Sequence, residues 1–502
     1  MSQTSITLTD LFLLAPELSL AGLGIFIILL NLVTKKTGIV NLVAVVGIAV
    51  PLTFSIAVLN HLNAEPSDQL TGMFGTMVID HFSLFFKFLV LAIVALIALS
   101  SSEHVANMKQ FQGEYYSLIM FSASGMMLIA SATELISIYV SLELTALPVA
   151  ALAAFSRNAV STEAGIKFLI LSAMSSAILL YGMALVFGFT GTTYLPEIFS
   201  SISSSFEPSV PFGSHALFLG VILIIAGFGF KIAAVPFQMW VPDVYEGSPT
   251  PITAYLSVAS KAAGFAIVLR VSYLAFGSLS LDWAAVFTIL SFASMTIGNV
   301  LAVAQDNIKR MLAYSTIAHA GYLMIGLAAI SERVPDGSDT IGPSAILFYL
   351  VAYAVTNLAA FFAIIAITSR TGSDLISSLT GVGRRSPILA LTLTLAIISL
   401  IGIPPTAGFM GKLYLFSAAI KSELVWLVVA GVINSTLSAY YYLRVVKVMY
   451  VSQAGSEDAA PITIAKAPLL ALSIASIGTL ALGIFPGPLI KIAEKAASVL
   501  LG

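Results

Sequence analysis

Long apolar runs recur along the whole chain and are separated by short polar stretches. Each run is close to the roughly 20 residues that a helix needs to cross the hydrocarbon core of a bilayer. We count 14 runs, and no stretch between them is long enough for a separate soluble domain. The sequence therefore predicts an all-α integral membrane protein. The expected spans are 12–34, 39–60, 78–101, 113–130, 133–155, 163–189, 215–239, 250–274, 281–304, 310–331, 342–369, 386–420, 424–450 and 465–490.

Two of these runs combine a proline with a nearby lysine. The seventh contains FKIAAVPFQMW, and the twelfth, which is too long for a straight span, contains SLIGIPPTAGFMGKLYLF. Proline has no N–H and leaves the carbonyl four residues earlier without its helical partner. Pro236 thus frees the carbonyl of Ile232, and Pro405 frees that of Ile401. We expect both helices to be discontinuous, with a polar gap beside each ammonium group.

The two broken runs are five spans apart. Because this offset is odd, the two units that contain them would enter the membrane from opposite sides, as inverted repeats of transporters do. The predicted parts are three N-terminal helices in residues 1–112, a five-helix unit in 113–275, an inverted five-helix unit in 276–452 and a last helix in 453–502.

The composition agrees with a membrane protein, since 59% of the residues are hydrophobic and 9% are charged, against about 25% charged in soluble domains. The absence of cysteine excludes disulfides and thiolate-bound metal or iron–sulfur centres. No glycine-rich phosphate loop, metal-binding pattern or nucleophile–base pair is present, so we expect no cofactor in this chain. The start, MSQTSITLTDL, lacks the features of a cleaved signal peptide, and the first run is expected to be retained.

Basic residues accumulate in the cytoplasmic loops of membrane proteins. If the N-terminus lies outside, 12 basic residues fall on the cytoplasmic side and 5 on the outer side. Both termini are therefore predicted outside. The inner group is Lys35, Lys36, Lys109, Arg157, Lys309, Arg310, Arg370, Arg384, Arg385, Arg444, Lys447 and Lys466, and the outer group is Arg270, Arg333, Lys421, Lys491 and Lys495.

The remaining five lysines fall inside expected spans: Lys87, Lys167, Lys231, Lys261 and Lys412. A lysine at the centre of a span costs about 2.5–3.5 kcal/mol on insertion scales, so these positions are candidates for function. Lys231 and Lys412 lie beside the breaks, and Lys261 lies deep in the eighth span between small residues. For each, a contact that only holds helices together is the alternative.

Two glutamates lie in the fifth span. Glu143 is in the middle of IYVSLELTALPVAAL, and because a buried carboxylate needs a cationic partner, we expect it to pair with Lys231. A hydrogen bond that only packs two helices is the alternative. Glu134, at the head of the span, is expected to cap the helix. Lys167 follows Glu163 by four residues, the favourable spacing for a helical ion pair, so a functional role and a surface pair are equally supported.

Lys87 belongs to an outer helix in this scheme, so we expect it to extend to the membrane surface or to contact another chain. His319 is the only histidine deep in a span. Its ordinary pKa near 6.5 suits a proton relay, and a hydrogen-bonded core histidine is the alternative. Lysines and a carboxylate at one level of the membrane fit proton transfer, because moving a carboxylate toward or away from a buried lysine would load or unload it.

Several stretches together resemble a known family over nearly the whole chain. They are LAPELSL, SLELTALPVAALAAF, STEAGIKFLILSAMSSAILLYGMALVFGFTGTT, FKIAAVPFQMWVPDVYEGSPTPITAYLSVASKAAGFA, QDNIKRMLAYSTIAHAGY and GIPPTAGFMGKLYLF. They are similar to the antiporter-like membrane subunits of respiratory complex I, most closely the family of its subunit N. The resemblance implies 14 helices, two inverted five-helix repeats, discontinuous helices 7 and 12, and no redox group in this chain.

The resemblance also assigns residues. Glu143 corresponds to the family's helix 5 glutamate and Lys231 to its helix 7 lysine. The lysines of helices 6, 8 and 12 correspond to Lys167, Lys261 and Lys412. The sequence departs from the family at Gln238, where many members have a histidine, so this position cannot relay a proton by ionising.

The implied function is proton translocation by a subunit of NADH:quinone oxidoreductase in a bacterial plasma (inner) membrane. Lys231 would accept protons from the cytoplasm, and Glu143 would set the pKa of this lysine. Lys261 would relay the protons and Lys412 would pass them outward. The implied partners are the lipid bilayer and other membrane subunits, including neighbouring antiporter-like subunits, and not nucleic acid. The quinone and the electron donor, NADH or a ferredoxin-like protein, are used by the whole complex on other chains.

Two rival functions remain. A subunit of an Mrp-type cation/proton antiporter shares much of the pattern NIKRMLAYSTIAHAGY, and such an antiporter would lack quinone-site partners and could carry Na⁺. A transporter of an organic solute is the other rival, but the expected lining of Gly, Ala, Ser and Lys offers no recognition pocket for a solute.

Overall fold

The computed structural model describes residues 6–34, 37–66, 68–108, 110–205, 211–329, 340–452 and 461–501. Within these residues, eleven helices are long and apolar enough to span a membrane, and Pro387–Ile401 is a shorter apolar helix. The prediction of an all-α membrane protein is therefore confirmed. Four of the loop residues used to orient the chain, Lys35, Lys36, Lys109 and Arg333, lie outside the described residues.

The elements follow one another as a nearly continuous series of helices. The N-terminal part contains α1 (Leu8–Leu13), α2 (Ala15–Val33), α3 (Thr37–Val46), α4 (Ala49–Ala64), β1 (Gln69–Gly72), β2 (Met77–Asp80), α5 (His81–Ser100) and α6 (Ser102–Ala106). The middle part contains α7 (Gln112–Ser131), α8 (Leu135–Ala153), α9 (Ala159–Thr190), α10 (Leu195–Ser205), α11 (Pro211–Ile232), α12 (Trp240–Gly247), α13 (Thr250–Tyr255) and α14 (Lys261–Leu274). The last part contains α15 (Ser280–Val303), α16 (Ile308–Ala328), α17 (Ile341–Thr371), α18 (Val382–Arg385), α19 (Pro387–Ile401), α20 (Ala407–Lys421), α21 (Val425–Tyr450), α22 (Lys466–Ile484) and α23 (Gly487–Ser498).

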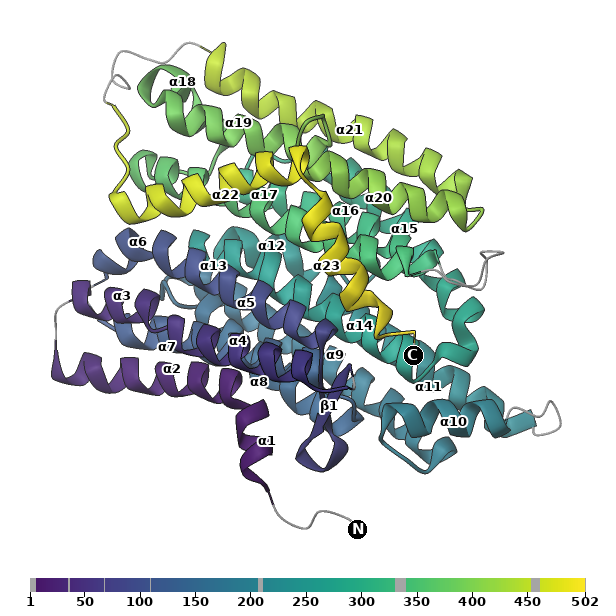
Figure 1. Cartoon of the computed structure of the whole chain (residues 1–502). Helices are drawn as coiled ribbons and strands as arrows, with labels where there is room; N and C mark the ends of the chain where they lie inside the picture. The colour runs from purple at the N-terminus through teal and green to yellow at the C-terminus, as the bar shows by residue number, and fades with distance from the viewer. Residues whose placement is uncertain are drawn as a thin grey trace.

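Each of the 14 apolar runs coincides with one helix or with consecutive helices. Most of the long helices run roughly side by side, with α6 and α18 at one end of the bundle and α10 at the other (Figure 1). Several short or amphipathic elements lie wholly or mostly outside the apolar runs, among them the antiparallel hairpin of β1 and β2, the helix α10, and α23, which packs on α5 and α17. The number of helices that cross the membrane and the division into inverted units stay predictions.

Both expected breaks are present. The twelfth run is divided where α19 ends at Ile401, because Gly402 adopts a left-handed conformation with φ 92° and the two prolines that follow cannot continue the helix. In the seventh run α11 ends at Ile232 and the next helix begins only at Trp240. The non-helical link between these two helices is held by a side chain of another helix: the Val235 amide donates to Ser294 Oγ of α15 at 2.9 Å.

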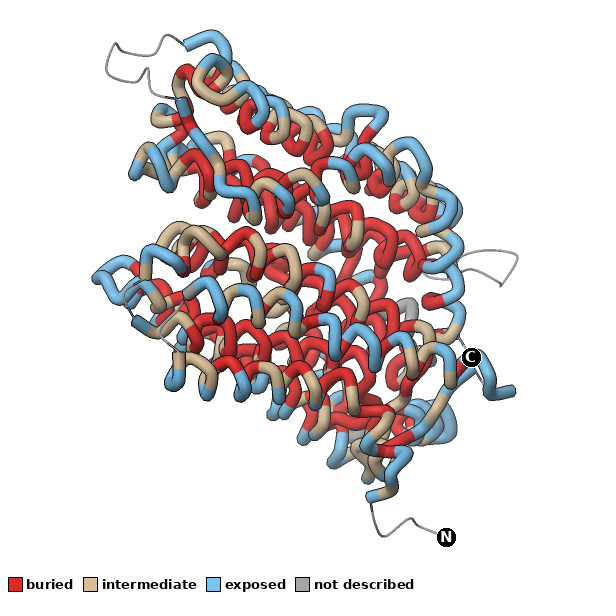
Figure 2. The backbone as a smooth tube through the Cα atoms, turned by 60° about the vertical axis from the view of Figure 1, so that its left-hand side comes forward, coloured by how far each residue is buried: buried red, intermediate tan, exposed pale blue. Residues whose placement is uncertain are grey.

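The centre of the bundle is formed by three helical segments. In each segment, the buried share of the most apolar stretch is high: it is 94% in Thr250–Leu274, 94% in Ile308–Ala328 and 83% in Ile341–Thr371. Buried positions run along the interior helices and exposed ones along the outer faces (Figure 2). Polar side chains on α14, α16 and α17 are therefore kept away from lipid.

The helix that carries Lys87 is also an inner helix. In α5, 72% of the apolar window is buried. Lys87 and Glu17 of α2 are 0% and 2% exposed, and their Nζ and Oε1 atoms lie 2.8 Å apart. The prediction that Lys87 extends to the membrane surface or contacts another chain is wrong, because an apolar pattern does not show which helix lies inside a bundle.

We expect Lys87→Met to destabilise the subunit strongly, since removing one partner of a buried ion pair costs about 3–5 kcal/mol. The double variant Lys87→Met with Glu17→Leu is expected to recover most of the loss, because an apolar pair leaves no unpaired charge. The measurement is the fraction of intact complex that survives stepwise heating, by size-exclusion chromatography. A double variant as labile as the single one would show that the pair itself is not the cause.

Candidate functional site

Two serines of α9 contact the two charged groups, one serine for Glu143 and the other for Lys231. The Ser176 hydroxyl donates a hydrogen bond to Glu143 Oε1, and the Lys231 ammonium donates to Ser172 Oγ at 3.0 Å. The serines are four residues apart and so share one face of the helix. The expected direct ion pair between Glu143 and Lys231 is therefore wrong, because hydroxyl groups occupy the contact positions on both sides. A hydroxyl both donates and accepts hydrogen bonds, so each serine is able to exchange a proton with the side chain that it contacts.

Glu134 and Lys167 make the contacts that their positions in the sequence indicate. Glu134 is the N-cap of α8 and accepts from the Ser137 amide at 2.7 Å, which confirms the capping prediction. Lys167 pairs with Glu163 and with Asp243 of α12, both at 2.8 Å, and 41% of its side chain is exposed. The surface ion pair expected for Lys167 is thus present, together with a second carboxylate that the sequence did not indicate.

Lys261 follows a π-helical segment, Leu256–Ser260, that interrupts the eighth run. Such bulges occur frequently at functional sites. Lys261 is 3% exposed, and its ammonium donates to the carbonyl oxygen of Thr316 on α16. It also lies 5.2 Å from the ring centre of Tyr353 on α17. The neighbours of this ammonium group are thus neutral oxygens and an aromatic ring.

His319 lies among tyrosines on α16 and α17. Its Nδ1 is 2.6 Å from the hydroxyl of Tyr349, and its ring centre is 5.0 Å from that of Tyr353. Tyr353 in turn shares a hydrogen bond of 2.9 Å with the Thr316 side chain, whose backbone holds Lys261. His319 is thus a hydrogen-bonded core residue, which was one of the two predictions for it. It is also a neighbour of the groups around Lys261.

Lys412 fills the break in the twelfth run. Its ammonium donates to the carbonyls of Leu400 at 3.0 Å and Ile401 at 2.8 Å and to Ser435 Oγ at 2.9 Å. The carbonyl that the proline frees, that of Ile401, is therefore satisfied by the lysine, as the sequence indicated. The ammonium also lies 4.5 Å from the ring centre of Tyr322, which is 5.7 Å from that of His319.

A small cavity of about 20 Å³ is lined by Lys231 of α11 and by Ser260, the residue next to Lys261. This volume is enough for one water molecule. Gln238 lies in the link between α11 and α12, and its buried Oε1 has no hydrogen-bond partner among the described residues. In the described ranges no group of three or more His, Asp or Glu side chains is placed to hold a metal ion, and the absence of a cofactor in this chain stays a prediction.

The partners of the lysines divide them into two classes. Lys87 and Lys167 face carboxylates. Within the described part of the chain, Lys231, Lys261 and Lys412 form no ion pair and donate only to hydroxyl and carbonyl oxygens. Because no ion pair breaks when these three lose a proton, they are the lysines suited to change charge.

Comparison with known proteins places the site in a shared region. Residues 132–438 match the family of NADH:quinone oxidoreductase/Mrp antiporter transmembrane proteins. The chain is 42% identical over 499 residues to NADH-quinone oxidoreductase subunit N of Dehalococcoides mccartyi, which covers 98% of this chain and 100% of that protein. It is 41% identical over 494 residues to the subunit N of Moorella thermoacetica, which covers 98% of this chain and 99% of that protein.

Two solved structures share the architecture. A chain of respiratory complex I from Thermus thermophilus is 30% identical, with a TM-score of 0.75 over 95% of this chain and 98% of that one. A chain of the Mrp complex from Dietzia sp. is 22% identical, with a TM-score of 0.84 over 97% of each chain, and shows the shared fold. The positions from Glu143 to Lys412 all fall within the matched residues 132–438.

Proposed function

We propose, because this chain belongs to the NADH:quinone oxidoreductase/Mrp antiporter family and within it to the subunit N proteins, that it is a proton-translocating membrane subunit of a NADH-quinone oxidoreductase. In this proposal it carries no redox centre, and NADH oxidation and quinone reduction take place on other subunits of the complex. Its partners are the other membrane subunits, including neighbouring antiporter-like ones. The membrane is the bacterial plasma (inner) membrane, with both termini outside the cytoplasm.

The observation that carries the proposal is the series of three lysines held by neutral oxygens. Lys231 accepts a proton from the cytoplasmic side and exchanges charge with Glu143 through Ser172 and Ser176. Lys261 relays the proton, and Lys412 releases it outward. A buried ammonium whose neighbours are neutral is stabilised or destabilised when another charge moves toward it or away from it. In this way, quinone reduction on other subunits would drive proton uptake and release by these lysines.

His319 and Lys167 have supporting roles in this proposal. His319 connects the surroundings of Lys261 to those of Lys412 through Tyr353 and Tyr322. Lys167, near the start of α9, holds Asp243 of α12 near the break. The two breaks, each with a lysine nearby, support the division of residues 113–275 and 276–452 into inverted five-helix units.

A Mrp-type antiporter subunit is the second candidate, favoured by the TM-score of 0.84 with the Mrp complex. The two candidates differ in their partners, because only the first requires subunits that reduce a quinone. Purification of the chain in its native complex, followed by identification of the other subunits, separates them.

We expect Lys231→Ala to abolish proton pumping and the electron transfer coupled to it while the complex still assembles. The measurement is acidification of proteoliposomes that contain the complex, with quinone reduction recorded in parallel. Lys491→Ala, which removes an exposed lysine of α23, is the control and is expected to pump normally. Normal pumping by the Lys231 variant would reduce this lysine to a structural role and refute the proposed route.

A further inference from the structure

A cavity of about 440 Å³ lies where the start of α7, the end of α8 and the first turn of α9 meet. These positions are the ends of expected spans, so the cavity lies at the edge of the membrane, at the end of the bundle expected to face the cytoplasm. Its polar lining is Glu114, Arg157 and Thr162, and its other walls are leucine, alanine and phenylalanine side chains. The cavity is therefore amphipathic, and none of the lysines assigned to the proton route lines it.

The two charged residues of this cavity have no ionic partner within the part of the chain that the structure describes. The Oε2 atom of Glu114 is shielded from solvent and has no hydrogen-bond partner there. Arg157 is exposed, and its guanidinium carbon lies 3.8 Å from the ring centre of Phe111. Stacking on a ring leaves the N–H donors at the edge of a guanidinium free to bind an acceptor. The cavity thus offers one cation and one anion that do not satisfy each other.

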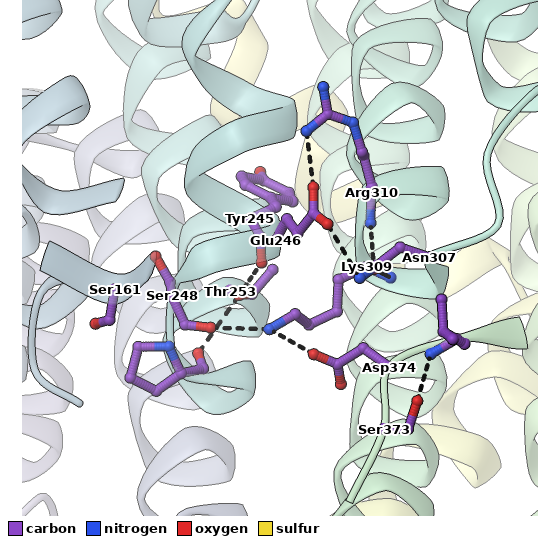
Figure 3. Close-up of polar contacts among 12 residues, drawn as sticks. Ser161, Tyr245, Glu246, Ser248, Thr253, Asn307, Lys309, Arg310, Ser373 and Asp374 are labelled. Carbon is purple, nitrogen blue, oxygen red and sulfur yellow. Dashed lines mark hydrogen bonds and ion pairs between the residues drawn. The ribbon is translucent and has the colours of Figure 1, made fainter. Parts of the chain in front are cut away.

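Charged residues next to this cavity are paired. Ser156, the neighbour of Arg157 in the chain, lines another cavity together with Lys309. Figure 3 shows Lys309 beside Asp374, at 3.0 Å, and Arg310 beside Glu246, at 2.7 Å. The unpaired state of Glu114 and Arg157 is therefore not a general property of this end of the bundle.

The backbone on two sides of the cavity is strained. Phe111, which precedes α7, and Arg157, between α8 and α9, adopt left-handed conformations with φ 68° and 54°. Such conformations are costly for residues other than glycine and occur preferentially at functional sites and ligand clamps. Here they belong to the two residues that form the stacked cation and ring of the cavity wall.

An apolar track runs from the cavity along the outside of α8. Ile136, Val140, Leu144 and Leu147 are exposed and follow one another at intervals of four or three residues, so they share one face of the helix. The same face continues to Ala151, which lines the cavity. From Ile136 to Ala151 the helix rises about 22 Å, which exceeds the roughly 15 Å of hydrocarbon in one leaflet. An acyl chain that starts at the cavity therefore has an apolar surface along its whole length.

We propose that this cavity binds the headgroup of a phospholipid of the phosphatidylethanolamine class, with an acyl chain along α8. The lipid phosphate accepts hydrogen bonds from the Arg157 guanidinium, which suits phosphate by its planar set of donors. The primary ammonium of the headgroup donates to the Glu114 carboxylate. A purely anionic headgroup such as phosphatidylglycerol would leave Glu114 unpaired beside a phosphate, and the choline headgroup has no N–H to donate.

The first test is labelling of the native complex with a phosphatidylethanolamine that carries a diazirine in its acyl chain. After illumination, mass spectrometry is expected to find the label on the peptides that line the cavity and on the exposed face of α8. Unlabelled phosphatidylethanolamine is expected to compete several-fold better than phosphatidylglycerol or phosphatidylcholine. Equal competition by the three lipids would refute the assigned headgroup chemistry. The absence of label from residues 111–162 would mean that a neighbouring subunit covers this surface, and the proposal would be withdrawn.

Two variants test the roles of the charges. Arg157→Gln is expected to lower the labelling several-fold. Glu114→Gln keeps the shape of the side chain and removes its charge, so phosphatidylglycerol is expected to compete as well as phosphatidylethanolamine. Arg384→Gln is the matched control, since this exposed arginine of α18 does not line the cavity. Labelling of both cavity variants with the amount and the lipid preference of the unchanged protein would overturn the proposal. The three buried lysines stay in place in all variants, so this outcome is independent of the proposed proton route.

Discussion

Replacement of Lys412 by arginine is expected to slow proton release through this subunit about a hundredfold while leaving its fold intact. The guanidinium keeps the positive charge and offers donors to the carbonyls of Leu400 and Ile401, which now accept from the lysine. A cavity of about 430 Å³ beside Lys412 gives the larger group room. Arginine is not deprotonated in proteins, so the variant is able to hold the break together but unable to release a proton.

The alanine variant at the same position separates charge from proton transfer. Lys412→Ala removes the donor to the carbonyl of Leu400, whereas the carbonyl of Ile401 still accepts from Ser435 Oγ at 2.6 Å. Loss of a donor to a buried group costs about 1–3 kcal/mol. Both variants are expected to pump about a hundredfold more slowly through this step, at the lower end of what a positioned acid–base group contributes. Only the alanine variant is expected to lose thermal stability. Pumping in proteoliposomes and heat resistance of the complex are the two measurements, and an arginine variant that pumps normally would limit Lys412 to an electrostatic role.

The helix breaks could be predicted from the sequence because their cause is local. A proline removes a backbone donor wherever it stands, so Pro236 and Pro405 mark the interruptions directly. The lysine at the second break followed from the same reasoning, since Lys412 lies one helical stretch beyond Pro405 and the freed carbonyls require a donor. Lys261 could be predicted as a candidate from the cost of placing a charge deep in a span, without knowledge of its neighbours.

Features that depend on the packing of distant helices could not be predicted. Glu17 and Lys87 are 70 positions apart, and nothing in either apolar run shows that α2 and α5 bury them together. The contacts of the α9 serines with Glu143 and Lys231 could not be predicted because serines are common in membrane helices, although the four-residue spacing of Ser172 and Ser176 was a usable signal. The same spacing relates Tyr349 and Tyr353 on α17.

The burial of the ionisable groups explains why the site occupies the interior of the bundle. Lys261, His319 and Lys412 are each at most 4% exposed. In a medium of low polarity, electrostatic interactions act over longer distances than in water, so a charge change at one lysine is felt at the next without direct contact. In the proposed route, the proton path between them would be supplied by hydrogen-bonding tyrosines and serines, which the charges alone do not provide.

The second large effect on assembly and pumping is expected from Gly408→Ala, which adds a single methyl group. Gly408 lies at the start of α20 against the end of α19, and a Cβ atom there would overlap the carbonyl oxygen of Ser399 and lie 2.8 Å from its carbon. The Gly408 amide also donates to Ser399 Oγ at 3.0 Å, and this hydroxyl shares a 2.9 Å hydrogen bond with Thr356 of α17. Gly408→Ala must therefore push α20 away from α19 and α17.

Such a shift would displace Lys412, one turn further along α20, from the carbonyls that hold its ammonium. Overpacking of this kind costs about 1–3 kcal/mol and more where backbone is involved, so we expect Gly408→Ala to reduce both the yield of assembled complex and its pumping. Gly22→Ala is the matched control, since a Cβ there meets nothing within 4 Å and alanine favours the helix. Yield by size-exclusion chromatography and pumping per complex are the measurements. Normal values for Gly408→Ala would show that the break adapts freely, and the rigid placement of Lys412 would then have to be abandoned.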